Sequence, residues 1–254
     1  MPVECRPGTA AVAVLVIGAT IVLALRGFAR VQVEPGGEPD TGEGFIGPRA
    51  RAWYRGLIEP IEEQLADWGA RPDHLTYTQL AVSVLAGLAF ASQCVFLAGW
   101  LTLFAGTLDI LDGGLARRTG LAGPHGAFID SVVDRWAEAT TFLGLGVFFR
   151  GSAMLVVVAL AAFSSLMVSY VRARAEGLGV ELRSGSVQRP ERFVILGFGA
   201  WISGLVGHLA CPLLGRQTHV VLAAAVVVLA AAATWTAVER ARDAAAALRA
   251  GAAR

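Results

Sequence analysis

The sequence predicts an all-α integral membrane protein. Of its 254 residues, 55% are hydrophobic and only 16% are charged, and the mean hydropathy is +0.59. Soluble domains carry about 25% charged residues. Seven apolar segments come near the roughly 20 residues that a helix needs to cross a bilayer. We expect these membrane spans at residues 9–25, 75–97, 100–115, 127–149, 153–171, 193–205 and 220–238.

The stretch between the first two spans separates the chain into unequal parts. Residues 1–30 hold the first span, and residues 34–44 have the glycine-, proline- and acid-rich composition of a flexible linker. Residues 52–68 mix aromatic and charged side chains, which favours an interfacial helix lying on the membrane, kinked at Pro60. We therefore expect an anchor at 1–30, a linker and interfacial helix at 31–71, and the main membrane domain at 72–254.

Arginine placement predicts the topology. Every basic residue is arginine, and these residues gather before position 75, at Arg117 and Arg118, between 172 and 192, and after 240. Because basic loops stay in the cytoplasm, we expect these ends to face it. The first span, followed by Arg26 and Arg30, should then run from outside to inside. A cleaved signal peptide is the alternative, but it would leave residues 31–71 outside and reverse the arginine bias.

Charge and cysteine content exclude other classes of protein. A net charge of +1 gives no reason to expect a nucleic-acid partner. The three cysteines lie far apart, so neither a disulfide framework nor a zinc site is indicated. Cys94 falls in an apolar segment and is expected to be a small buried side chain.

Four aspartates interrupt the apolar sequence within 26 residues: Asp109, Asp112, Asp130 and Asp134. A carboxylate at the centre of a membrane helix costs roughly 2.5–3.5 kcal/mol, so four without partners would cost on the order of 10 kcal/mol. On helices, the first two share a face at i, i+3 and the last two at i, i+4. With the helices antiparallel, the two pairs face each other. Such oxygen ligands suit Mg²⁺ or Mn²⁺, and four carboxylates are enough for two ions.

The residues around the first pair fit a phosphorylated ligand. Gly113 and Ala116 are small enough to let a ligand approach the backbone. Arg117 carries a permanent charge that suits a phosphate. Small residues and an arginine in this register argue against a cation transporter, which also places carboxylates in membrane helices. No inverted repeat of the kind common in transporters is visible either.

The whole run, D-x-x-D-G-x-x-A-R-x(8)-G-x-x-x-D-x-x-x-D, resembles the signature of the CDP-alcohol phosphotransferases. The resemblance covers residues 72 to the C-terminus. It implies a core of six transmembrane helices, usually in a homodimer. It also implies transfer of a phosphatidyl group from a CDP-linked lipid to an alcohol, with release of CMP.

The resemblance also suggests individual roles. Asp109, Asp112 and Asp130 would be the surest metal ligands, while Asp134 would be both a ligand and the general base for the acceptor hydroxyl. Asp73 alternatively only caps a helix. The residues that would contact the nucleotide are Asp73, Thr76, Gly113, Ala116 and Arg117.

A second basic stretch is similar to the branch of the family that makes phosphatidylinositol phosphate. In that branch, basic residues matching Arg172, Arg192 and, by a looser alignment, Arg240 line the pocket for the acceptor's phosphate. Relatives often have lysine at the position of Arg172, and a guanidinium binds phosphate as a planar fork instead. The alternative is that these arginines only anchor helix ends to anionic lipid.

The resemblance implies a phospholipid-synthesising enzyme, and the arginine placement favours a site that opens to the cytoplasm from the cell (inner) membrane. Its substrates would be CDP-diacylglycerol and a small phosphorylated alcohol, with inositol phosphate as the first expectation. Glycerol 3-phosphate is the alternative, because it also presents a phosphate to a basic pocket. Uncharged acceptors fit so many arginines less well.

Overall fold

The computed structural model describes residues 48–182, 189–214 and 219–252, and within these ranges the chain is helical, without a strand. The predicted first span and the linker lie outside the described residues. The helices are α2 (Pro48–Asp67), α3 (Pro72–Ala91), α4 (Val95–Arg118), α5 (Pro124–Phe148), α6 (Met154–Glu176), α7 (Arg189–Leu214) and α8 (Val220–Ala252).

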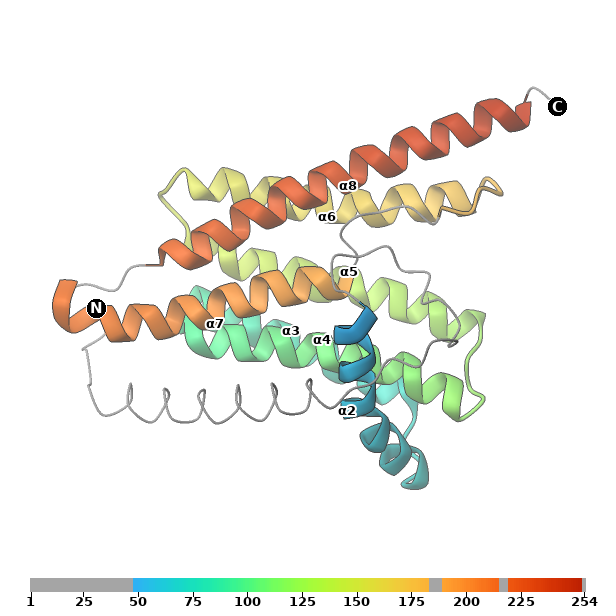
Figure 1. Cartoon of the computed structure of the whole chain (residues 1–254), viewed down its shortest axis with the longest axis horizontal. Coiled ribbons are helices and arrows are strands. Elements are labelled where there is room, and N and C mark those ends of the chain that lie inside the picture. The colour runs from blue at the N-terminus through green and yellow to red at the C-terminus, as the bar shows by residue number, and fades with distance from the viewer. Residues whose placement is uncertain (1–47, 183–188, 215–218, 253–254) are drawn as a thin grey trace.

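Helices α3 to α8 close into a ring of neighbours. Helix α3 packs against both α4 and α5, α4 against α7, and α7 against α8, while α6 contacts α8 and α5. Figure 1 shows these six helices running roughly along one direction, whereas α2 crosses them and touches α4. Successive helices alternate in direction, so the beginnings of α3, α5 and α7 lie at the same end as the last turns of α4, α6 and α8. This end carries the aspartates and most of the arginines.

The turn between α3 and α4 lies earlier than the sequence predicts. We expect a span at 75–97, but α3 ends at Ala91 and α4 begins at Val95. Gln93 takes a left-handed backbone conformation with φ 63°, and its N–H donates to the carbonyl of Phe90, 2.9 Å away. The expectation that Cys94 is buried is wrong as well, because this polar turn leaves its side chain exposed.

The apolar core fills the end of the bundle away from the aspartates. Its buried members come from six helices and include Phe90 of α3, Leu145 of α5 and Leu222 of α8, each fully enclosed. The end that carries the aspartates also buries polar and charged side chains, among them Asp112, Asp134 and Arg192. Buried charges are thus concentrated at one end of the bundle.

Glycines allow α3 and α5 to approach very closely. A Cβ at Gly144 would collide with the backbone of Gly87, and a Cβ at Gly87 would collide with the carbonyl of Thr140. Small residues at such contacts are the usual means by which membrane helices pack. This contact fixes the separation of the helix that carries Thr76 from the helix that carries Asp130 and Asp134.

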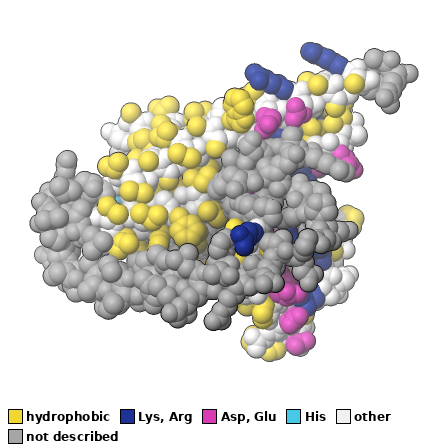
Figure 2. All heavy atoms as spheres, viewed as in Figure 1, with side chains coloured by type: hydrophobic (Ala, Val, Ile, Leu, Met, Phe, Trp, Pro, Cys, Tyr) yellow, Lys and Arg dark blue, Asp and Glu magenta, His cyan; other side chains and the backbone are white. Residues whose placement is uncertain are grey.

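Four described helices are long and apolar enough to cross a membrane: α3, α4, α6 and α8. The predicted spans at 127–149 and 193–205 also correspond to helices, α5 and α7, although α5 ends at Phe148. Helix α5 carries four charged side chains: Asp130, Asp134, Arg135 and Glu138. In Figure 2, apolar side chains cover much of the visible surface of the bundle, and charged ones gather towards the end where α8 finishes and α2 lies. The chain is an all-α membrane protein with one polar end.

Helix α2 is attached to α4 at two places along its length. The Tyr54 hydroxyl donates to Thr107, 2.7 Å away, and Ile58 is buried. Further along α2, Arg118 pairs with Glu63 at 2.9 Å and with Glu59 at 3.4 Å. Pro60 lies inside the helix, which continues past it. The predicted interfacial segment is therefore one helix attached to the helix of the first aspartate pair.

Candidate active site

Three of the four aspartates meet at one point between α4 and α5. Asp109, Asp130 and Asp134 each offer a carboxylate oxygen, and these oxygens all lie within 4.8 Å of one another. The i, i+4 spacing on α5 and the contact of α3 with both neighbours bring them together. Asp112, the fourth predicted ligand, is buried beside this group but is not part of it.

The chemistry of this cluster fits a divalent cation. One oxygen of Asp130, Oδ1, is buried and has no hydrogen-bond partner among the described residues. Buried carboxylate oxygens without partners are costly unless a cation or donor satisfies them. Hard divalent ions prefer oxygen ligands of this kind. Asp109, Asp130 and Asp134 are therefore the residues that could hold a metal, and Asp112 lines the adjoining cavity together with Asp130.

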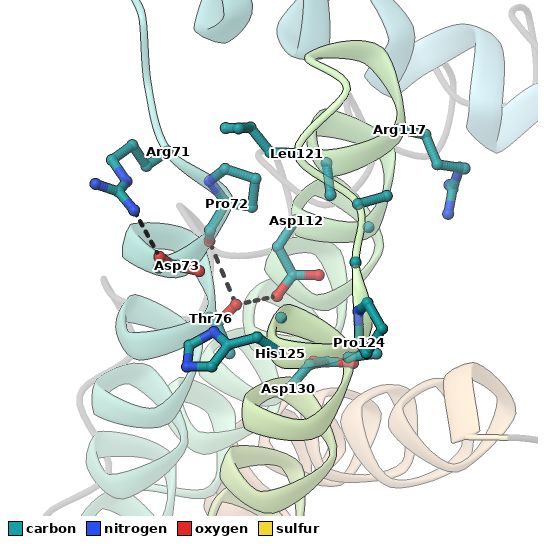
Figure 3. A pocket seen from close by; sticks show the side chains of 16 residues that line it. Arg71, Pro72, Asp73, Thr76, Asp112, Arg117, Leu121, Pro124, His125 and Asp130 are labelled. Carbon is teal, nitrogen blue, oxygen red and sulfur yellow. Dashed lines mark hydrogen bonds and ion pairs between the residues drawn. The ribbon is translucent and has the colours of Figure 1, made fainter.

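A cavity of about 410 Å³ opens beside Asp112 and Asp130 (Figure 3), a size typical of small-molecule sites. The Thr76 hydroxyl donates to Asp112 Oδ2 at 2.8 Å, and Asp73 forms an exposed ion pair with Arg71 at 3.3 Å. All five residues predicted to contact a nucleotide line this cavity: Asp73, Thr76, Gly113, Ala116 and Arg117.

Arg117 lies over the glycine of the motif. Its guanidinium nitrogen would be 3.4 Å from a Cβ at Gly113, an ordinary contact distance, so the arginine lies directly against this position. The Arg117 side chain is exposed at the rim of the cavity. The next residue, Gly114, is more restricted, because a Cβ there would collide with the Glu62 carboxylate of α2. Both faces of this glycine pair are thus occupied by charged side chains.

Gln79 of α3 is a site residue that the sequence analysis missed. It is fully buried, and its amide nitrogen lies 3.5 Å from Asp109 Oδ1 and 3.4 Å from Asp134 Oδ1. It follows Thr76 by three residues, on the same face of α3. A polar side chain in register with Thr76 inside an apolar span was the available signal.

Arg189, at the start of α7, was also missed, and it reaches the same carboxylates. Its Nη1 lies 2.5 Å from Asp109 Oδ1 and also forms an ion pair with Asp134 Oδ2. The guanidinium lies 5.4 Å from the ring centre of Phe193, one turn along the helix. The basic stretch around Arg192 was the signal, but nothing in the sequence said which arginine meets the aspartates.

A second cluster of arginines lies next to the carboxylates, against α6. Arg192 and Arg240 are 6% and 8% exposed, and they donate to the backbone carbonyls of Ser165 and Val168, at 3.2 and 3.1 Å. Their anchoring carbonyls are three residues apart on α6, so the two guanidinium groups are neighbours. Arg172 differs, because its side chain is 58% exposed and pairs with Glu176 at 2.8 Å.

Glu138 and Arg135 connect the two clusters. Glu138, one turn after Asp134 on α5, accepts from Arg192 at 2.6 Å. Arg135 lies 3.8 Å from Asp134 and 3.7 Å from Glu138, and it also bonds to Ser169 of α6. Acidic and basic side chains thus alternate from the cavity to α6. Such an arrangement offers a place for a cation at the aspartates and a place for an anion at the arginines.

Comparison with known proteins gives a consistent family. The family model for CDP-alcohol phosphatidyltransferases matches residues 70–240. Archaetidylinositol phosphate synthase of Methanothermobacter thermautotrophicus is 34% identical over 202 residues, covering 80% of this chain and 95% of the relative. Phosphatidylinositol phosphate synthase of Mycobacteroides abscessus is 36% identical over 163 residues, covering 62% of this chain and 74% of the relative.

Solved structures agree with this assignment. The crystal structure of Mycobacterium tuberculosis phosphatidylinositol phosphate synthase with CDP-DAG bound has a TM-score of 0.61 and 27% identity, covering 73% of this chain and 92% of that one. The same enzyme in complex with manganese and citrate has a TM-score of 0.62, also at 27% identity, covering 73% of this chain and 87% of that one. The signature, the fold and these matches agree: the chain belongs to the CDP-alcohol phosphatidyltransferase family.

Proposed function

We propose that the protein transfers a phosphatidyl group from CDP-diacylglycerol to a hydroxyl of inositol phosphate and releases CMP. Relatives that make phosphatidylinositol phosphate or archaetidylinositol phosphate support this reaction. The observation that carries the choice of acceptor is the buried pair Arg192 and Arg240 beside the carboxylate cluster. Two guanidinium groups kept out of water favour an acceptor that brings its own negative charge.

The cavity beside Asp112 would take the CDP part of the lipid. The small residues Gly113 and Ala116 allow close approach, Thr76 orients Asp112, and Arg117 at the rim is available to a phosphate. Similarity to an enzyme whose structure contains CDP-DAG supports this placement. In this proposal Asp73 contributes from the mouth of the cavity, where it pairs with Arg71.

Asp109, Asp130 and Asp134 would hold a divalent metal, and with Asp112 the set is sufficient for two ions, Mg²⁺ or Mn²⁺. Similarity to a manganese complex supports a divalent cation at this cluster. When bound, the metal would neutralise the pyrophosphate and orient it for displacement at phosphorus.

Asp134 is our candidate for the general base. It is the member of the carboxylate cluster that also lies 3.8 Å from Arg135, and it contacts Gln79 and Arg189. A hydroxyl of an acceptor held by Arg192 and Arg240 would come close to it, and the carboxylate would accept the hydroxyl proton as the oxygen attacks the lipid-bearing phosphorus. Gln79 holds this carboxylate in place through its amide nitrogen.

In this proposal the polar end of the bundle faces the cytoplasm across the cell membrane, because the arginines gather there. CDP-diacylglycerol enters laterally from the bilayer, and the lipid product returns to it. A homodimer is the expected assembly from the family resemblance. Glycerol 3-phosphate remains a second candidate acceptor, since a basic pocket recognises the phosphate rather than the polyol.

A panel of acceptors tests the proposal. Purified full-length protein would receive CDP-diacylglycerol and Mg²⁺ or Mn²⁺, with inositol phosphate, glycerol 3-phosphate, inositol or serine, and CMP release would be followed. We expect fastest release with inositol phosphate. Preference for glycerol 3-phosphate would support the second candidate, and turnover only with an uncharged alcohol would contradict a phosphorylated acceptor.

A further inference from the structure

Only one of the three guanidinium nitrogens of Arg189 has a polar partner among the described residues. One nitrogen, Nη1, contacts both Asp109 Oδ1 and Asp134 Oδ2. The other two nitrogens, Nε and Nη2, are buried and have no hydrogen-bond partner among the described residues. A structural arginine normally uses several of its five N–H groups. In this position Arg189 neutralises two carboxylates, but two of its own three nitrogens have no hydrogen-bond partner among the described residues.

The two carboxylates that Arg189 contacts are also the ones that would hold a metal. Asp109 and Asp134, with Asp130, form the group whose oxygens lie within 4.8 Å of one another. A divalent ion would place its +2 charge at this point, directly beside the charged Nη1. Such like charges, in a site shielded from water, repel strongly. A guanidinium at this distance and a bound metal therefore compete for the same oxygens.

We infer that Arg189 is a displaceable counter-ion of the carboxylate cluster. Either Arg189 or a divalent metal neutralises Asp109 and Asp134, and binding of the metal moves Arg189 away from them. The inference rests on the proposed function in taking the cluster as a metal site. The further point is that Arg189 itself competes with the metal and neutralises the carboxylates before the metal binds.

Release would also bring Arg189 to the second anion site. Arg189 and Arg192 are three residues apart and share a face of α7. The nitrogens of Arg189 that have no partner would then be available to an acceptor's phosphate beside Arg192. Loading of the metal would thereby prepare the pocket for the other substrate.

Two simpler roles give different results when the arginine is removed. If Arg189 only orients Asp134 for the metal, its removal weakens metal binding. If it acts only through its positive charge, removal of any nearby arginine tightens binding equally. Arg192 is the matched control, because it is buried one turn away on the same helix and its described contacts are Glu138 and the Ser165 carbonyl.

The first test measures Mn²⁺ binding to purified full-length protein by electron paramagnetic resonance, without substrates. We expect Arg189→Gln to bind Mn²⁺ at least about tenfold more tightly than wild type, since a competing occupant lowers the apparent affinity. Arg192→Gln should change the affinity by less than about threefold. Unchanged or weaker binding by Arg189→Gln, or equal gains in both variants, would overturn the inference.

Thermal unfolding of the same variants is an independent test of the counter-ion role of Arg189. In EDTA, Arg189→Gln should melt well below wild type, because the carboxylates lose their counter-ion, and Mn²⁺ should restore most of the difference. A variant that is equally destabilised with and without Mn²⁺ would instead assign Arg189 a general structural role and contradict the inference. Because neither measurement uses substrates, failure of the proposed reaction would be seen separately, as absence of CMP release.

Discussion

Four acids of the site each have a cation or donor from another helix: Asp109, Asp112, Asp134 and Glu138. Thr76 of α3 donates to Asp112, Gln79 of α3 lies beside Asp109 and Asp134, and Arg192 of α7 pairs with Glu138. Removing one partner of a buried charge pair is much more damaging than the net contribution of the pair. At the scale of residues, the site is thus a network of paired side chains. The effect of a substitution depends on which charged or polar group it leaves without a partner.

Substitution of Asp134 by asparagine tests its role as base. The amide keeps the shape and one oxygen for Gln79 or a metal, but it cannot accept the acceptor's proton. We expect Asp134→Asn to lower turnover by roughly 10²–10⁴-fold, the usual contribution of general base catalysis. CMP release measures turnover, and retention of radiolabelled CDP-diacylglycerol measures binding.

The control for this variant is Asp243→Asn, at an exposed position of α8. It should keep turnover near that of wild type. Near-normal CMP release by Asp134→Asn would remove Asp134 as the base and leave it only as a ligand.

Arg192 and Arg172 should differ in their effect on the acceptor. Arg192 is buried beside Arg240, whereas Arg172 is exposed and paired with Glu176. A charge-assisted hydrogen bond contributes about 1.5–3 kcal/mol, or roughly ten- to a hundred-fold in affinity. We expect Arg192→Ala to raise the KM for inositol phosphate by that factor and leave the KM for CDP-diacylglycerol nearly unchanged.

For Arg172→Ala, the expected rise in the acceptor KM is less than about threefold. Initial rates at varied concentrations of each substrate measure both constants. An equal loss of affinity for both substrates in Arg192→Ala would indicate that this arginine supports the fold rather than the acceptor.

At the scale of helices, the contact of α3 with α5 sets the width of the site. Gly144 lies against the backbone of Gly87, where a side chain has no room, while a Cβ at Gly146 would meet only Leu155 at an ordinary 3.6 Å. Overpacking costs typically about 1–3 kcal/mol. We expect Gly144→Ala to lower the Tm by several degrees in detergent, at roughly 2–4 °C per kcal/mol.

Gly146→Ala, two residues along the same helix, should leave the Tm within about one degree of wild type, because its Cβ has room. Equal melting of the two variants would show that α3 and α5 can separate without loss, contrary to the packing seen here.

The sequence predicted these helices well and their contacts poorly. Apolar length located the helices, and the spacing of the aspartates placed two on each of α4 and α5. The turn at Gln93 was missed, because a short polar interruption does not break an apolar segment. Gln79 and Arg189 were missed for another reason: their roles depend on which faces of α3 and α7 meet α4, and that is decided by packing.

At the scale of the whole molecule, the charged end and the α3–α4 turn lie at opposite ends of the bundle. Cys94 is exposed in that turn. If the charged end faces the cytoplasm, an impermeant thiol reagent should label Cys94 in intact cells, with Cys5 and Cys211 replaced by serine. Labelling is measured by mass shift on a gel.

Leu121→Cys in a Cys94→Ser background is the matched probe. Leu121 is exposed between α4 and α5, at the charged end. It should react only after the membrane is made permeable. The reverse pattern, with Leu121→Cys labelled in intact cells and Cys94 protected, would overturn the proposed orientation.

In the proposed reaction, an intact phosphorylated acceptor joins the lipid. Inositol phosphate carrying ³²P would be incubated with the protein, CDP-diacylglycerol and Mn²⁺, and the label would be followed into the chloroform phase together with CMP release. We predict that label enters the lipid one for one with CMP. Release of CMP while the label stays in water would contradict the claim, as would lipid formed equally well from unphosphorylated inositol.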